Sequence, residues 1–309
     1  MEKNEIANGA DLKIASWLRE VFEFLSEHRG YNFELQRKYY ASIALGSDTA
    51  ARKLLSLVWK VAQTQSGGDI DRLGWTLFHL ENITNQCVQG EKIDLGKWLV
   101  AIANEMPRHI DHEVFSKRGR EYFQSREFER SYETSPWRAM TDLFEAIPGL
   151  GFKTGRLLAK SIYHCGSPKL RYLTLDQAYL TNVPKLDESD LIQLPVDRVI
   201  INIFELVHLK KGIGFNMGND SRKIARTIER CCSGGEDGEG KGLYSGLSSE
   251  VWDDLWFWGF ISQKGSGNNR EHTFNLNKYL CLEFARRDEC TLKELKGLSD
   301  KFVALCSKT

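Results

Sequence analysis

The segment EAIPGLGFKTGRLLAKSIYHCG, from Glu145 to Gly166, combines a turn sequence with a cation at a helix start. Pro148, Gly149 and Gly151 predict a tight reversal, because glycine tolerates positive φ angles and proline stops a helix. An apolar, helix-forming run follows, with Lys153 near its beginning. Backbone amides at a helix start, together with the positive end of the helix dipole, favour an anion. The segment therefore predicts two helices joined by a phosphate-binding turn, although the pattern alone also fits an ordinary turn between helices.

A carboxylate stands at a second helix start, in the segment QLPVDRVIINIFELVH. Asp197 follows Leu-Pro-Val and precedes an apolar run with helical spacing. Aspartate is a preferred N-cap residue, so its presence at this position needs no functional explanation. The information lies in the combination of this aspartate with the lysine of the preceding turn.

The two motifs together, IPGLGFKTG and a PVD that opens an apolar helix, resemble the helix-hairpin-helix superfamily of DNA glycosylases of base excision repair. The resemblance implies that Lys153 attacks the sugar and that Asp197 assists. It also implies that Gly149, Gly151 and Thr154 bind DNA phosphates. In such chemistry the modified nucleotide is rotated out of the duplex, and a neutral amine displaces the base. An imine between Lys153 and C1′ then permits β-elimination, which makes the expected enzyme a glycosylase with AP-lyase activity and no cofactor.

Within the superfamily, the sequence is most similar to archaeal 8-oxoguanine DNA glycosylases, through Lys160 in KTGRLLAK, seven residues after Lys153, and through DDLWFWG. The resemblance implies a base pocket that contains Gln36, Trp75, Lys160, Asp254 and Trp258. Asp254 and Trp258 are four residues apart and share a helix face, so a hydrogen-bond acceptor stands beside a stacking plane. Such a pair suits an oxidised purine, whose N7 carries a hydrogen. Taken singly, each aromatic side chain of this helix is expected in the core.

Departures from the family pattern leave alternatives open. The interval between Lys153 and Asp197 is longer than in the family, and Asp176 in TLDQAYL is a rival for the catalytic aspartate. Pro195 and Val196 complete the motif before Asp197, which favours Asp197. A second interpretation is a glycosylase of the same fold that removes a bulky modified base from phage DNA or hydrolyses a modified nucleotide. A third is a non-catalytic DNA-binding module, which leaves the lysine and aspartate pairing unexplained.

Composition indicates a cytoplasmic globular protein. The 309 residues are 41% apolar, and 42 basic residues balance 42 acidic ones, so a polyanion must bind a local patch. The charged stretch HEVFSKRGREYFQSREFERSYE favours a solvated helix face with paired charges over a direct contact. The sequence predicts no membrane span and no metal site, and its seven cysteines are expected to be reduced. The expected partner is double-stranded DNA containing a modified base, bound by a monomer.

The elements that position these residues are expected to be helices, in an all-α fold of two subdomains flanking a cleft. Ile14, Trp17, Leu18, Val21, Phe22 and Leu25 form one helix face, which Asp11 caps and Gly30 ends. Further helical periods cover 49–63, 73–87, 95–105, 136–146, 153–164, 197–209, 220–231, 248–261 and 292–306. The predicted subdomains are 30–166, ending in the hairpin, and 1–29 with 167–309, which includes a glycine-rich loop at 232–246.

Overall fold

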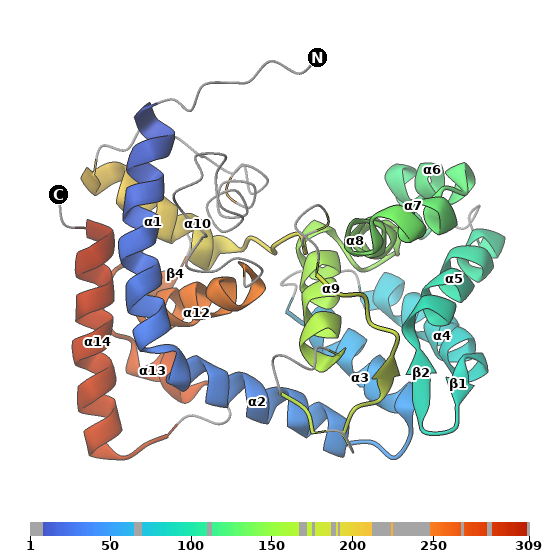
Figure 1. The fold of residues 1–309 in the computed structure, drawn as a ribbon, viewed down its shortest axis with the longest axis horizontal. Helices are drawn as coiled ribbons and strands as arrows, with labels where there is room; N and C mark the ends of the chain where they lie inside the picture. The colour runs from blue at the N-terminus through green and yellow to red at the C-terminus, as the bar shows by residue number, and fades with distance from the viewer. Residues whose placement is uncertain are drawn as a thin grey trace. The chain divides into compact units, whose positions relative to one another are not determined.

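A computed structural model of the chain shows a mainly helical protein, which confirms the predicted all-α class (Figure 1). The structure describes residues 9–64, 70–109, 113–166, 172–174, 177–186, 190, 192–211, 224, 248–266, 269–282 and 286–307. No helix among these residues combines the length and apolarity required to cross a bilayer.

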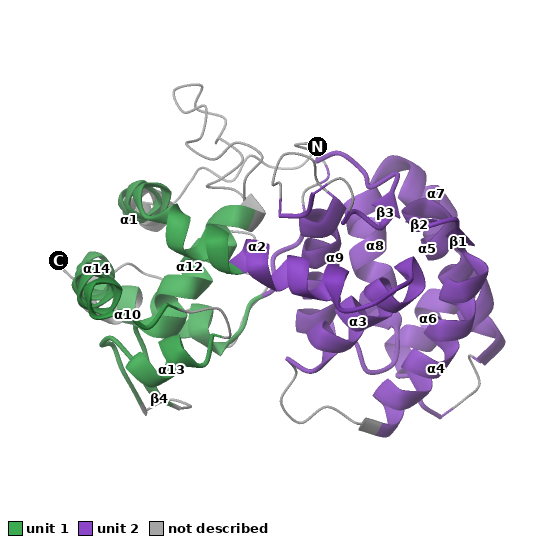
Figure 2. Cartoon of the chain, turned by 90° about the horizontal axis from the view of Figure 1, so that it is seen from below, with its two compact units in different colours: residues 1–35, 196–309 green, residues 36–195 purple. Residues whose placement is uncertain are grey.

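The chain divides into two compact units, coloured separately in Figure 2. Unit 2 comprises 36–195, and unit 1 comprises 1–35 and 196–309, so the two ends of the sequence belong to the same unit. Helix α2 (Arg29–Leu45) contributes residues to both.

Unit 2 is built from helices that pack around buried aromatic and aliphatic side chains, among them Leu54, Trp98, Trp137, Phe144 and Ile162. Helix α8 packs on α7 and α9, and α3 packs on α4 and α9. The helices are α3 (Ala50–Ala62), α4 (Ile70–Gln86), α5 (Leu95–Glu105), η1 (Met106–His109), α6 (Lys117–Ser125), α7 (Phe128–Thr134), α8 (Pro136–Ala146) and α9 (Phe152–Gly166).

A small sheet ties a distant segment to unit 2. Strands β1 (Val88–Gln89) and β2 (Lys92–Asp94) are antiparallel, and β2 pairs in parallel with β3 (Leu180–Thr181) in the register Ile93 opposite Leu180. Asp190 adds a second tie, because its carboxylate accepts the backbone N–H groups of Trp137 and Arg138. These contacts join Leu180, Thr181 and Asp190 to unit 2, whereas the sequence-based boundary assigns them to the other subdomain.

Unit 1 consists of α1 (Gly9–Glu27), α10 (Arg198–Lys211), α12 (Ser248–Ile261), α13 (Leu276–Leu280) and α14 (Glu289–Ser307). Helices α1 and α14 lie side by side (Figure 1), and the Trp17 indole donates a hydrogen bond to the carbonyl of Leu305 at 3.1 Å. Strands β4 (Lys264–Ser266) and β5 (Asn269–Glu271) form an antiparallel hairpin after α12.

The predicted face of the first helix is confirmed at Trp17, Leu18, Val21, Phe22 and Leu25, all of which are buried. Its predicted ends are wrong, because α1 includes Asp11, ends at Glu27 and is followed by α2 with Gly30 in its first turn. Gly30 does not have a positive φ angle, so it does not act as a C-terminal stop. Helix α2 itself was not predicted, because its apolar residues do not gather on one face. The expected helix at 220–231 and the loop at 232–246 lie outside the described residues, apart from Ile224.

Candidate functional site

The predicted turn between two helices is present, with α8 ending at Ala146 and α9 beginning at Phe152. Gly149 has a φ of 80°, a conformation that a residue with a side chain rarely adopts. A Cβ atom at this position would also lie 3.0 Å from the Cα atom of Leu73 in α4. The Thr76 hydroxyl, also in α4, donates a hydrogen bond to the carbonyl of Pro148. Helix α4 therefore holds the turn from one side.

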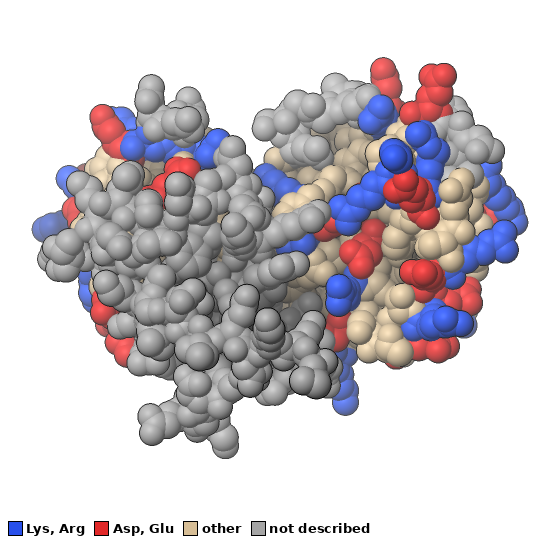
Figure 3. Space-filling model, turned by 90° about the horizontal axis from the view of Figure 1, so that it is seen from above, with Lys and Arg blue, Asp and Glu red and all other residues tan. Residues whose placement is uncertain are grey.

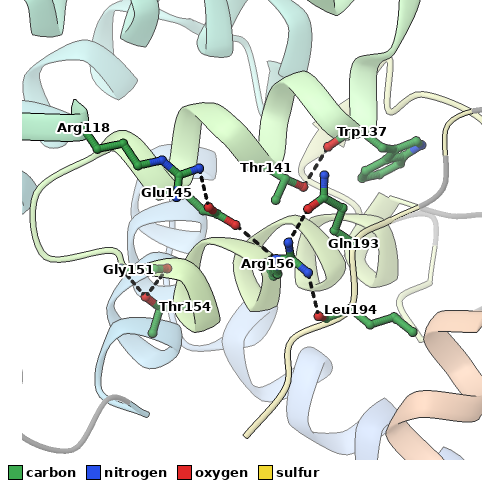
Figure 4. A network of polar contacts seen from close by, with 9 residues as sticks. All are labelled: Arg118, Trp137, Thr141, Glu145, Gly151, Thr154, Arg156, Gln193 and Leu194. Carbon is green, nitrogen blue, oxygen red and sulfur yellow. Dashed lines mark hydrogen bonds and ion pairs between the residues drawn. The ribbon is translucent and has the colours of Figure 1, made fainter. Parts of the chain in front are cut away.

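Thr154 stabilises the turn from within. Its Oγ1 accepts the Gly151 N–H at 2.8 Å and lies 3.2 Å from the Gly151 carbonyl oxygen, to which it donates (Figure 4). Thr154 is fully buried. Its hydroxyl stabilises the turn by accepting the Gly151 N–H. Contacts of Gly149, Gly151 and Thr154 with a DNA phosphate stay a prediction.

Lys153 is the second residue of α9 and is half-buried. Its Nζ atom donates a hydrogen bond to the carbonyl of Thr64 at 3.2 Å, and the bond is exposed to solvent. Within the described part of the chain, Lys153 makes no ion pair. Lys160 lies two turns further along the same helix face, about 10.5 Å along the axis, and is buried.

Arg156, three residues after Lys153, has a structural role. The buried carboxylate of Glu145 pairs with Arg156 Nε at 3.1 Å and with Arg118 at 3.0 Å (Figure 4). The Arg156 guanidinium also donates to Gln193 Oε1 at 2.5 Å and to the Leu194 carbonyl at 3.3 Å, and it stacks on the Phe152 ring. Arg156 therefore fastens the hairpin to the last residues before Pro195, and its charge is already neutralised.

Asp197 is the residue before α10, and it caps this helix as the sequence predicts. Its Oδ1 accepts the Ile200 N–H at 3.1 Å. Its Oδ2 accepts the indole N–H of Trp256 in α12 at 2.9 Å. The Trp256 ring stacks on Phe260 at 4.8 Å between centroids. The carboxylate is half-buried and is oriented by two donors, one of which, Trp256, lies 59 residues away in the sequence.

Asp254 and Trp258 lie in the interior of unit 1. Asp254 accepts a hydrogen bond from Asn32 at 2.7 Å, and Arg29, which pairs with Glu250, lies 3.9 Å from its other oxygen. Trp258 is fully buried. Its ring contacts Phe24, His28, Tyr31 and Phe257 edge-on. Stacking of a base on Trp258 would require these neighbours to move, so its place in a base pocket stays a prediction. The indole N–H of Trp258 has no hydrogen-bond partner among the described residues.

The remaining predicted pocket residues, Gln36 and Trp75, lie in unit 2 and are half-buried. The Trp75 ring packs against His79, His109 and Phe115, at 4.4–5.6 Å between centroids. The predicted residues therefore divide between the units, with Gln36, Trp75, the hairpin, Lys153 and Lys160 in unit 2 and Asp197, Asp254 and Trp258 in unit 1. Asp176 lies outside the described residues.

Sequence reasoning missed three contacts of these residues, made by Trp256, Asn32 and Arg29. Trp256 and Asn32 bind their carboxylates across long sequence intervals, which no local pattern signals. From its spacing, Trp256 is expected in the core like the other aromatic residues of α12.

Charge is mixed on the described surface, where Lys and Arg alternate with Asp and Glu over unit 2 in the space-filling view (Figure 3). Lys117 lies 3.9 Å from Glu121, which agrees with a solvated helix face at this stretch. The five described cysteines are free thiols, and the described residues contain no cluster of three or more side chains suited to hold a metal. Comparisons with protein-family models, with curated proteins and with solved structures found no match to this chain.

Proposed function

We propose that the protein is a DNA glycosylase with AP-lyase activity, which excises a modified base such as 8-oxoguanine from duplex DNA through Lys153. The observation that carries the proposal is the setting of Lys153. This amine stands at the first turn of a helix, immediately after a braced turn, and donates a hydrogen bond to the carbonyl of Thr64. The nearby cations Arg118 and Arg156 are instead paired with Glu145. Among the described residues, Lys153 has no acidic partner. A lysine in such a setting at a helix start, where the dipole disfavours a cation, contributes little to stability and is suited to chemistry.

The proposed reaction starts when the modified nucleotide is turned out of the stack, so that its C1′ atom becomes accessible. The neutral Nζ of Lys153 attacks C1′, and the bond between C1′ and the base breaks with its electron pair leaving on the base. Opening of the sugar ring converts the adduct into an imine. Loss of a proton from C2′ then expels the 3′ phosphate by β-elimination, and water releases the lysine.

Asp197 is assigned the electrostatic part of this reaction. As the base leaves, positive charge develops on the sugar, and a fixed carboxylate stabilises it. The Ile200 amide and the Trp256 indole hold the two oxygens of Asp197 in place, so little reorganisation is needed during the reaction.

Borohydride trapping tests the proposal, because reduction converts the imine into a stable covalent complex. The full chain is incubated with duplexes that each carry a different modified base. We expect the wild-type protein to form a complex with at least one duplex, and Lys153→Gln to form none. Lys117→Gln is the matched control, since Lys117 is also an early helical residue but lies exposed near Glu121. Base release without any adduct would show that water is the nucleophile, and absence of both on every duplex would reject the proposal.

A further inference from the structure

A half-buried corner of unit 1 next to Asp197 combines aromatic and cationic side chains. Trp256, which holds Asp197, stacks on Phe260 with an angle of 11° between the rings. The Nζ atom of Lys278, in α13, lies 5.2 Å from the centroid of the Phe260 ring. The aromatic pair therefore links the carboxylate of Asp197 to a lysine from another helix.

Arg270 reaches the same corner from strand β5. Its guanidinium donates a hydrogen bond of 2.8 Å to Oε1 of Gln263, a buried residue. The amide nitrogen of Gln263 donates in turn to the carbonyl of Val199, in the first turn of α10, at 3.1 Å. Arg270 is thereby tethered to the helix that Asp197 caps. Arg198, the first residue of α10, is a third cation, and it lies 3.8 Å from the carboxylate of Glu205.

These charges influence one another. Burial lowers the pKa of Lys278, and repulsion by Arg270 lowers it further, whereas attraction by Asp197 opposes the shift. Burial also lowers the pKa of Arg270, with Asp197 opposing and Arg198 adding to the effect. Arg270 and Lys278 thus both act on the carboxylate of Asp197, and their two positive charges exceed its one negative charge, which favours a bound anion.

We propose that Arg270 and Lys278, beside the Trp256 and Phe260 rings, bind phosphodiesters of the DNA strand at Asp197. The inference rests on the proposed function, because it places substrate DNA at this carboxylate. A guanidinium fork matches phosphate oxygens, and an ammonium serves as a point charge. Stacked rings beside cations are suited to a nucleic-acid strand, whose sugars and bases pack on aromatic faces while its phosphates meet the charges.

Binding of an uncleavable duplex, measured by fluorescence anisotropy at several salt concentrations, tests this site. The duplex carries a tetrahydrofuran abasic analogue, and the test protein is the full-length double variant Arg270→Gln/Lys278→Gln. Each lost phosphate contact reduces the slope of log K against log salt by about 0.9. We therefore expect the double variant to reduce the slope by about 1.8 and to weaken binding most at low salt.

The matched control is Lys293→Gln/Lys296→Gln, which removes the same charge from exposed positions of α14. Its slope should equal that of the wild type. An equal decrease in both double variants would show a diffuse field instead of a site, and an unchanged slope in Arg270→Gln/Lys278→Gln would overturn the proposal. Melting temperatures verify folding, and Arg270→Lys, which keeps the charge, should retain most of the slope.

A deoxynucleoside monophosphate titration identifies the source of the phosphate. If the mononucleotide saturates the corner as tightly as the duplex, the ligand is a free nucleotide and the DNA assignment is wrong. Borohydride trapping is run on the same variants. If Arg270→Gln/Lys278→Gln forms a normal adduct and keeps the wild-type salt slope, only this phosphate site is rejected. If the double variant has a reduced slope but the wild-type protein forms no adduct, only the proposed glycosylase reaction is rejected.

Discussion

Lys153 and Asp197 both stand at the start of a helix, but their surroundings differ. Lys153 in unit 2 has one exposed hydrogen bond to a carbonyl. Asp197 in unit 1 uses both carboxylate oxygens, one in a helix cap and one in a bond to Trp256. The structure therefore gives Asp197 a sufficient structural role and gives Lys153 almost none.

The comparison shows how each residue should respond to mutation. A substitution of Lys153 should change activity with little change in stability, because its side chain makes one exposed hydrogen bond in the described part of the chain. A substitution of Asp197 must preserve the cap, so that a loss of activity is not caused by fraying of α10.

The largest expected effect is that of Asp197→Asn on excision. Asparagine keeps the size of the side chain and caps helices well, so the melting temperature should change little. Loss of the charge that stabilises the sugar cation should lower the single-turnover rate by about 10²–10³-fold. DNA binding should survive, because phosphate contacts come from amides and basic side chains.

Two variants control for this effect. Asp94→Asn alters another aspartate cap, since Asp94 accepts the Lys97 N–H in unit 2, and it should leave the rate unchanged. Asp176→Asn tests the rival carboxylate. Near-normal excision by Asp197→Asn with loss in Asp176→Asn would reverse the assignment, and normal rates in both would remove the glycosylase interpretation.

The next effect concerns the stability of unit 2. Arg156→Ala removes one of the two arginines that pair with the buried Glu145 in Figure 4 and leaves Arg118, and it removes the hydrogen bonds to Gln193 and to the Leu194 carbonyl. Removal of one member of a buried ion pair costs about 3 kcal/mol. Arg118→Ala, at a more exposed arginine of the same network, should cost about 1 kcal/mol or less. Urea unfolding of both variants measures the difference, and equal losses would show that Arg156 is not the anchor.

The smallest effect is expected for Trp256→Phe, which keeps an aromatic ring against Phe260 and removes the N–H donor to Asp197. A hydrogen bond to a charged group contributes about 1.5–3 kcal/mol. We expect about a tenfold lower rate at saturating DNA, with little change in DNA affinity, because the carboxylate loses its orientation. Trp59→Phe, at an exposed tryptophan, is the control. An unchanged rate in Trp256→Phe would show that Asp197 needs no second donor.

Local patterns predicted the helices well where one face is apolar and the ends carry turn signals. The bounds of α8 and α12 agree with the sequence, and α9 begins one residue before its predicted start. Helix α2 is not predicted because its apolar residues are distributed around the helix. The prediction that Gly30 ends the first helix is wrong because Gly30 does not have a positive φ angle.

The contacts of the candidate site were harder to predict from the sequence, because they join segments that are distant in the chain. The cap at Asp197 follows from local sequence, but the bonds from Trp256 to Asp197 and from Asn32 to Asp254 depend on tertiary packing. Likewise, the sequence predicts that one helix carries three cations, Lys153, Arg156 and Lys160, and it does not distinguish their roles. Packing distinguishes them, because Arg156 pairs with Glu145 and Lys160 is buried, whereas Lys153 stays half-buried with one carbonyl contact.

Peptide mapping of the reduced complex by mass spectrometry tests the central claim most directly. After borohydride trapping on the duplex that reacts best, proteolysis and nuclease digestion leave a sugar remnant on the attacking lysine. We expect a single modified peptide, from the start of α9, with the remnant on Lys153. A remnant on Lys160, Lys278 or any other lysine, with Lys153 unmodified, would contradict it.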